Sequence, residues 1–205
     1  MSVNDATESA APAGGLALAT RAGLSDDLKI LLAHYPREVW DSHANLGEMA
    51  RFWLSRHDMF RDLGAMLDDA AGSFRTGGID AHQFAGFFAP RLQFFLQQLH
   101  AHHHIEDDHY FPIFRRADVR LIRGFEMLES DHDALAASIQ DSVNAANHFL
   151  RTLNAVPGDV QSAADAYIQS GAVLLRGLIR HLDDEEDLIV PLILDRGEDA
   201  LGVGH

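Results

Sequence analysis

The chain has 205 residues, of which 47% are hydrophobic and 23% charged, the proportions of one globular domain. Its formal net charge of -15, from 16 Lys and Arg against 31 Asp and Glu, argues against a nucleic-acid partner, because phosphate binding needs a basic surface. The absence of cysteine excludes disulfides and thiolate metal sites, so any metal must be held by histidine and carboxylate ligands.

The N-terminal residues 1–24 are small and polar, without a basic start or a long apolar block, so we expect a flexible tail rather than a signal peptide. Ser25 with the two acids after it is typical of a helix start, and Pro36 of a helix end. We therefore expect a short N-terminal helix in a domain over residues 25–205. No run reaches the roughly 18 apolar residues of a membrane helix. With the missing cysteines, this favours a cytoplasmic protein.

From Ser42 onward, four long segments carry apolar residues at intervals of three and four, which places them on one face of a helix. Turn signals separate the segments at residues 76–80, 116–118 and 156–159. Strand-type alternation is absent, so the sequence predicts an all-α chain. Short connections between long helices favour an antiparallel up-down-up-down four-helix bundle.

Each predicted long helix carries one histidine near the middle of its apolar face. In chain order these are His57, His102, His132 and His181. The midpoint between each successive pair falls inside the corresponding turn signal, so in an antiparallel bundle the four residues share one layer. A single core histidine is usually satisfied by a hydrogen bond, but unrelated core histidines have no reason to share a layer.

Three acids accompany this histidine layer. Glu106 and Glu185 lie four residues after His102 and His181, and Glu129 lies three residues before His132. In helices of alternating direction, all three lie about one turn, roughly 5 Å, to the same side of the layer. On the other side of the layer, the apolar faces of the predicted helices carry Phe60, Leu99, Leu135 and Leu178. Buried carboxylates are costly unless cations balance them, so the pattern predicts a metal site.

The predicted metal ligands are His57, His102, Glu106, Glu129, His132, His181 and Glu185. Imidazole and carboxylate ligands suit iron, manganese or zinc better than calcium or magnesium. The set is too large for one tetrahedral zinc ion, so two metal ions fit better. We place His103 and His104 at the boundary or surface, with His103 as a lesser ligand candidate. His109 is expected to hydrogen-bond a ligand carboxylate.

The four histidines lie in four sequence motifs. These are SRHDMFRDL around His57, His102-x-x-x-Glu106 closed by Phe111-Pro112, ESDHDAL around His132, and His181-x-x-x-Glu185-Glu186 followed by Pro191. Together they resemble the helices of hemerythrin-like (HHE cation-binding) domains, over about residues 43–195. The resemblance implies an antiparallel four-helix bundle around two iron ions, oxo- or hydroxo-bridged, with manganese or zinc as alternatives.

Two departures from oxygen-carrying hemerythrins bear on function. Those proteins have a second histidine where this chain has Ala136, and Glu129 is the candidate to replace it. Their last ligand is an aspartate five residues after the fourth-helix histidine, whereas here Glu185 at four is better placed and Glu186 at five is the alternative. Fewer imidazoles and more carboxylates favour ferric iron, so metal binding is better supported than reversible oxygen carriage.

The leading functional expectation is a metal pair that binds oxygen, a peroxide or nitric oxide in sensing, storage or stress protection. Its basis is the apolar layer, which suits a small uncharged ligand. A di-iron enzyme that oxidises iron, disproportionates peroxide or reduces nitric oxide is one alternative, because carboxylates stabilise ferric products and move protons. A metal-sensing or structural bundle is another. The sequence points to no nucleic-acid, membrane or identifiable protein partner.

Overall fold

The computed structural model describes residues 17–155 and 159–204, and throughout these residues the chain is helical or irregular, without strands. The four long helices are α1 (Glu48–Arg75), α2 (Ala81–Ile105), α4 (Ile122–Leu153) and α5 (Val160–Arg196). The shorter elements are the 3-10 helices η1 (Arg37–Ser42) and η3 (Val119–Leu121), the π-helix η2 (Glu106–Tyr110), and the helices α3 (Phe111–Ala117) and α6 (Glu198–Leu201). The predicted all-α class is confirmed.

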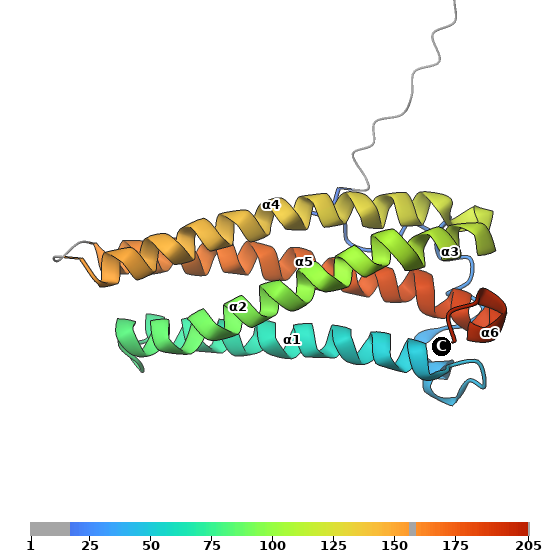
Figure 1. The fold of residues 1–205 in the computed structure, drawn as a ribbon, viewed down its shortest axis with the longest axis horizontal. Coiled ribbons are helices and arrows are strands. Elements are labelled where there is room, and N and C mark those ends of the chain that lie inside the picture. The colour runs from blue at the N-terminus through green and yellow to red at the C-terminus, as the bar shows by residue number, and fades with distance from the viewer. Residues whose placement is uncertain (1–16, 156–158, 205) are drawn as a thin grey trace, which may run out of the picture.

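The long helices lie side by side along the long axis of the molecule, and successive ones run in opposite directions (Figure 1). α2 packs against both α1 and α4, and α5 also packs against both. The connection from α1 to α2 falls at the predicted turn. There Gly77 adopts a φ of 75°, and a reciprocal pair of hydrogen bonds between Asp80 and Gln83 caps α2. Of the predicted turn between α4 and α5, residues 156–158 lie outside the described residues.

The segment before the bundle differs from its prediction. Residues 26–35 form successive turns rather than a helix, and the first helical element is η1, directly after Pro36. Of the predicted tail, residues 1–16 lie outside the described residues. Residues 17–24 pack on the bundle, where Arg21 and Leu24 are 7% and 4% exposed. The packed chain therefore begins before the predicted boundary at residue 25, because the bundle supplies carboxylate partners for Arg21.

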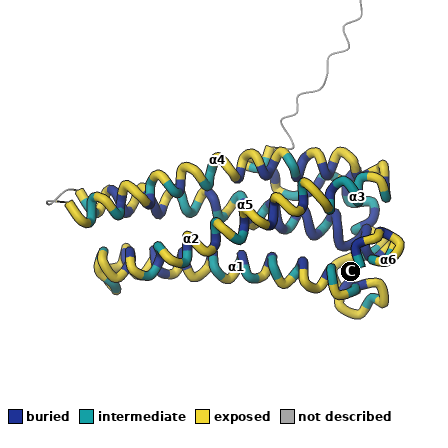
Figure 2. Tube along the Cα trace, viewed as in Figure 1, coloured by how far each residue is buried: buried dark blue, intermediate teal, exposed yellow. Residues whose placement is uncertain are grey.

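Buried residues follow the inward faces of the helices (Figure 2). A layer of buried polar residues lies between two apolar clusters of the core. Trp53, one turn before His57, belongs to an apolar cluster at the α3 and α6 end of the bundle. Phe60, one turn after His57, belongs to a second cluster with Leu99, Leu135 and Leu178. The four residues of the predicted apolar layer are thus brought together on one side of the histidines.

The π-helix η2 changes which residues face the core after Glu106. The Phe111 N–H donates to the carbonyl of Glu106, five residues earlier, so this turn holds one residue more than an α-helical turn. The apolar face of the chain beyond it is rotated by about 100°. His109 is consequently exposed, contrary to the role expected for it, and Phe111 and Phe114 are fully buried.

Over residues 17–155 and 159–204, no helix has the combined length and apolarity that a membrane span requires.

Candidate metal centre

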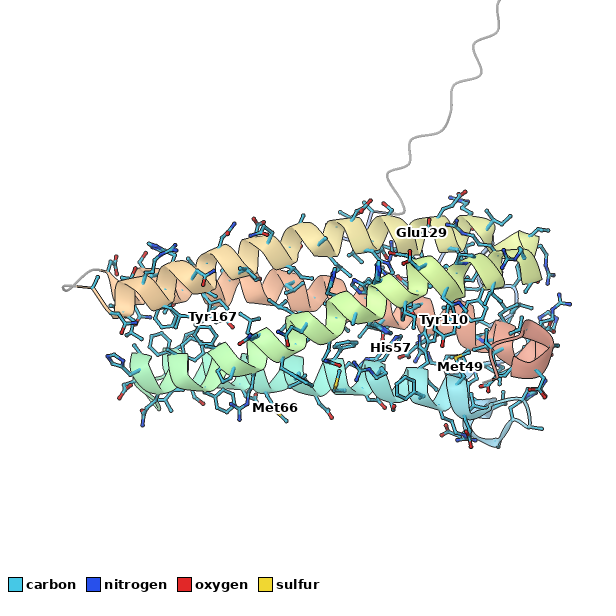
Figure 3. All side chains as sticks on the ribbon, in the orientation of Figure 1. Met49, His57, Met66, Tyr110, Glu129 and Tyr167 are labelled. Carbon is cyan, nitrogen blue, oxygen red and sulfur yellow. The ribbon has the colours of Figure 1, made fainter. Side chains whose placement is uncertain are left out.

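Six of the seven predicted ligands meet in the buried layer. They are His57, His102, Glu106, His132, His181 and Glu185, and each is at most 8% exposed. His103, also 8% exposed, joins them. Figure 3 shows His57 in the interior of the half that carries Tyr110, away from Tyr167 in the other half. The ligand atoms form two groups, and within each group they all lie within 4.8 Å of one another.

The first group contains His57 of α1 and His102 of α2, with Glu106 and Glu185. The Nε2 atoms of the two histidines are 3.0 Å apart. Two nitrogens bound to one metal ion at about 2.1 Å and about 90° would lie about 3.0 Å apart. One Glu106 oxygen lies 2.9 Å from His102 Nε2, and one Glu185 oxygen lies 3.5 Å from His57 Nε2. The spacing is that of four donors around one cation.

The second group contains His103 of α2, His132 of α4 and His181 of α5, with Glu106. The Nε2 atoms of His132 and His181 are 3.2 Å apart, and the His103 ring stacks on that of His132 with their centroids 4.0 Å apart. The other Glu106 oxygen is 3.5 Å from His132 Nε2, and the other Glu185 oxygen is 3.2 Å from His181 Nε2. Each of these two carboxylates therefore directs one oxygen to each group.

Several of these ligand atoms have no hydrogen-bond partner. Both Glu106 oxygens, Glu185 Oε2 and His103 Nε2 are buried and unpartnered. Leaving such atoms unpaired costs about 1–3 kcal/mol each, and more where the group is charged. Metal ions bound among the two groups would satisfy all four atoms, so the residues present fit a cation site.

A family model described as the hemerythrin HHE cation binding domain matches residues 48–193. The chain belongs to this family. No curated protein and no solved structure gives a match. Membership agrees with the buried histidine and glutamate cluster, which fits a cation site.

In this hemerythrin domain, carboxylates behind three histidines fix the direction of their rings. Nδ1 of His57 lies 3.0 Å from Glu186, Nδ1 of His132 lies 2.8 Å from Asp107, and Nδ1 of His181 lies 3.4 Å from Asp131. A carboxylate only accepts, so each Nδ1 carries the donated proton, and each Nε2 faces the cluster. Such outer contacts orient metal-binding imidazoles and raise their basicity.

Arginines in turn hold two of these carboxylates. Arg61 and Arg37 donate to Glu186 at 2.8 and 3.0 Å. Burial raises the pKa of Glu186, but the hydrogen bonds and charges of His57 and Arg61 outweigh it and lower the pKa to about 2. Arg21, from the segment before the bundle, donates to Asp131 at 3.0 Å and to Asp184 at 2.7 Å. Glu186 therefore supports His57 from behind rather than facing the ligand groups, as its alternative role would have required.

The candidate ligands of this hemerythrin domain differ in their protonation. Burial, reinforced by neighbouring imidazoles, lowers the pKa of His103 well below its usual value and that of His102 to about 3, so both are neutral. Burial also lowers the pKa of His181, but Asp131 and Glu185 outweigh it and raise the net value to about 9. Burial and Glu185 raise the pKa of Glu106. Cation binding must therefore displace protons from this layer.

The structure does not bring Glu129 to the layer. Its side chain is 36% exposed and pairs with Arg115 of α3 at 2.5 Å. Glu129 precedes His132 by less than a full helical turn, and the buried acid on this face of α4 is Asp131, which is 2% exposed. The expectation that Glu129 replaces the missing imidazole is corrected by this position.

His103 is the ligand candidate that the sequence undervalued. Neighbouring residues of a helix point about 100° apart, so a prediction that gives each helix one buried face placed His103 at the boundary of that face. However, α2 lies between two neighbours, and His102 meets His57 of α1 while His103 stacks on His132 of α4. The signal was the adjacent pair His102-His103, because a helix between two partners can direct consecutive residues to each.

Proposed function

We propose that this hemerythrin-domain protein binds two metal ions, one in each ligand group. His57 and His102 would hold the first ion, and His103, His132 and His181 the second. Glu106 and Glu185 would bridge them. The observation that carries the proposal is the orientation of the two glutamates, because each directs one oxygen to each group and three of the four oxygens lack a hydrogen-bond partner.

Iron is the metal that we propose first. The donors are five imidazoles and two shared carboxylates without sulfur, a set that suits iron and also accepts manganese or zinc. Neutral imidazole is the form that binds a metal ion, and burial keeps His102 and His103 in this form near neutral pH.

We further propose that the metal pair binds a small ligand such as oxygen, a peroxide or nitric oxide, in sensing, storage or stress protection. Support comes from the apolar cluster beside the histidines, in which Phe60, Leu99, Leu135 and Leu178 are each at most 1% exposed. A dry apolar wall favours an uncharged diatomic over a larger polar substrate. Bound iron would supply the electron changes that these ligands undergo, and the chain would hold the metals and exclude water.

Metal content and the visible absorption spectrum of purified protein test the metal pair. We expect two iron ions per chain in the wild type. Glu106→Gln removes a shared charge and should leave at most one ion, whereas Glu129→Gln, at an acid outside the layer, should leave two. Wild-type protein that holds one ion or none after anaerobic incubation with ferrous iron would contradict the proposal.

Ligand binding is tested separately, by adding nitric oxide or hydrogen peroxide to iron-loaded protein. A saturable spectral change at one equivalent per metal pair would support the proposed role, and an unchanged spectrum would contradict it. Steady consumption of peroxide, lost in His102→Ala, would identify an enzyme instead.

A further inference from the structure

A cavity of about 360 Å³ lies between α2 and α4, beside the second ligand group. Its polar lining consists of His100, His103, His104, Asp107, His132 and Asp133. Ala136 completes one wall. His100, His104, Asp133 and Ala136 are exposed, so the cavity opens to solvent.

The inner end of this cavity is the metal centre itself. His103 and His132 line the cavity and also belong to the second ligand group. His103 is 8% exposed and its Nε2 is buried without a hydrogen-bond partner. Asp107 connects the two environments, because its side chain is 39% exposed and accepts a hydrogen bond from His132 Nδ1. Oxygen and nitrogen donors thus extend from the surface to the buried ligands.

The charge of this cavity differs from that of two other cavities near the layer. The cavity between α1 and α5 is lined by Arg61 and Arg176, with Asp68 as its acid. The cavity beside residues 18–21 is lined by Arg21, Arg176 and Arg180. Arginine offers a cation no ligand atom, whereas carboxylates and imidazoles can bind it and replace its water ligands one at a time.

We propose that the cavity between α2 and α4 is the route by which divalent cations enter the metal centre, with Asp133 attracting them at its mouth. The inference rests on the proposed metal pair and adds the path by which it is filled. An anion would be disfavoured by Asp107 and Asp133, and a neutral diatomic has no need of a polar path. The chemistry of the lining therefore selects a hydrated cation.

The test is the rate at which the metal-free full chain takes up Co²⁺, followed by stopped-flow visible absorbance. Asp133→Lys should slow the second-order rate constant about fivefold at low ionic strength, because it reverses the charge at the mouth. At about 0.5 M salt, where screening is strong, the difference should disappear. The matched control is Asp141→Lys, which makes the same change at an exposed position of α4. Its rate should stay within about twofold of the wild type.

A second pair of variants tests the passage itself. Ala136→Leu, at an exposed wall of the cavity, should slow uptake about tenfold with the same final number of ions, because it fills the space that the cation crosses. Ala65→Leu makes the same change at an exposed wall of the cavity between α1 and α5, and should have no effect.

Uptake by Asp133→Lys and Ala136→Leu at the wild-type rate, or equal slowing by the control variants, would overturn the proposed route while leaving the metal pair intact. A wild-type chain that takes up no Co²⁺ at all would overturn the metal pair, and the route with it. The final stoichiometry and the rate therefore separate the two failures.

Discussion

At the scale of single residues, Trp53 shows how an apolar-looking position can act on the centre. Trp53 lies on the apolar face of α1, and the residue is 6% exposed in the core. Its indole N–H donates to Glu185 Oε1 at 2.6 Å. Glu185 is one of the two carboxylates that face both ligand groups. One hydrogen bond therefore fixes the rotamer of a proposed bridge.

Trp53→Phe is expected to lower metal affinity about tenfold, because it removes this donor while retaining an aromatic ring. The measurement is competition for Zn²⁺ with a chelator of known affinity. Trp40→Phe is the matched control, since Trp40 is also buried and its indole donates to the Tyr35 carbonyl at 2.8 Å, outside the ligand layer. Both variants should lose stability. Equal affinities in the two variants would show that the bond to Glu185 has no role in metal binding.

At the scale of elements, helical periodicity was enough to predict the all-α chain and to place six ligand candidates in one layer. It failed where the helix itself changed. A 3.6-residue period placed His109 on the inner face of the second predicted helix, but the π-helix Glu106–Tyr110 turned Phe111 and Phe114 inward instead. The periodicity of apolar residues does not predict a helical turn that contains one extra residue.

The turns before the bundle show a second limit of sequence reasoning. Residues 17–24 are mostly small and lack helical periodicity, yet Arg21 is buried between α4 and α5. Its position depends on Asp131 and Asp184, more than a hundred residues away, and Asp131 lies next to His132, a candidate ligand. A contact of this kind depends on the assembled bundle and leaves no local signal.

Arg21→Met is expected to destabilise the protein by about 3 kcal/mol, because it leaves the carboxylate of Asp131 buried beside His181 without its arginine partner. Arg123→Met is the control. Arg123 also joins α4 to the segment before the bundle, through Asp27 at 2.9 Å, but both side chains are more than half exposed. Its loss should cost less than about 1 kcal/mol. Urea unfolding of both variants measures the difference, and similar losses would contradict the buried role of Arg21.

The junction of α3 and α4 gives a pH-dependent prediction. Hydrogen bonds from Arg120, aided by Arg196, hold the pKa of Asp118 below its usual value. A lowered carboxyl pKa contributes stability above the unfolded value of about 3.9, and this contribution is lost as the pH falls through the folded value. Asp118→Asn should therefore be slightly less stable than wild type at pH 7 and equal to it at about pH 2 in urea unfolding. A constant difference across this range would contradict the prediction.

At the scale of the whole molecule, the ligand layer divides the core between two apolar clusters and leaves buried polar atoms unpartnered. The metal-free chain should therefore be far from its optimum of stability. Any cation that binds only the folded state stabilises it by mass action, by about 4 kcal/mol at a thousandfold excess over Kd. Removal of metal with a chelator should lower the thermal unfolding temperature, and added Zn²⁺ should restore it. An unchanged unfolding temperature would exclude a tightly bound metal.

The stability lost to unpartnered polar atoms without metal, and regained on metal binding, can be tested at one side chain, Glu106. Both of its oxygens are buried without a hydrogen bond, and in the metal-free chain burial and Glu185 raise its pKa. Glu106→Leu removes these unsatisfied atoms, so the metal-free variant should be about 1–2 kcal/mol more stable than the metal-free wild type. The order should reverse with Zn²⁺, because only the wild type keeps the shared carboxylate. Leu99→Ala, in the adjacent apolar cluster, should destabilise both states, since it opens a cavity without removing a ligand. A Glu106→Leu variant that is less stable than wild type also without metal would show that Glu106 stabilises the fold itself. It would contradict a role in binding that lowers the stability of the metal-free chain.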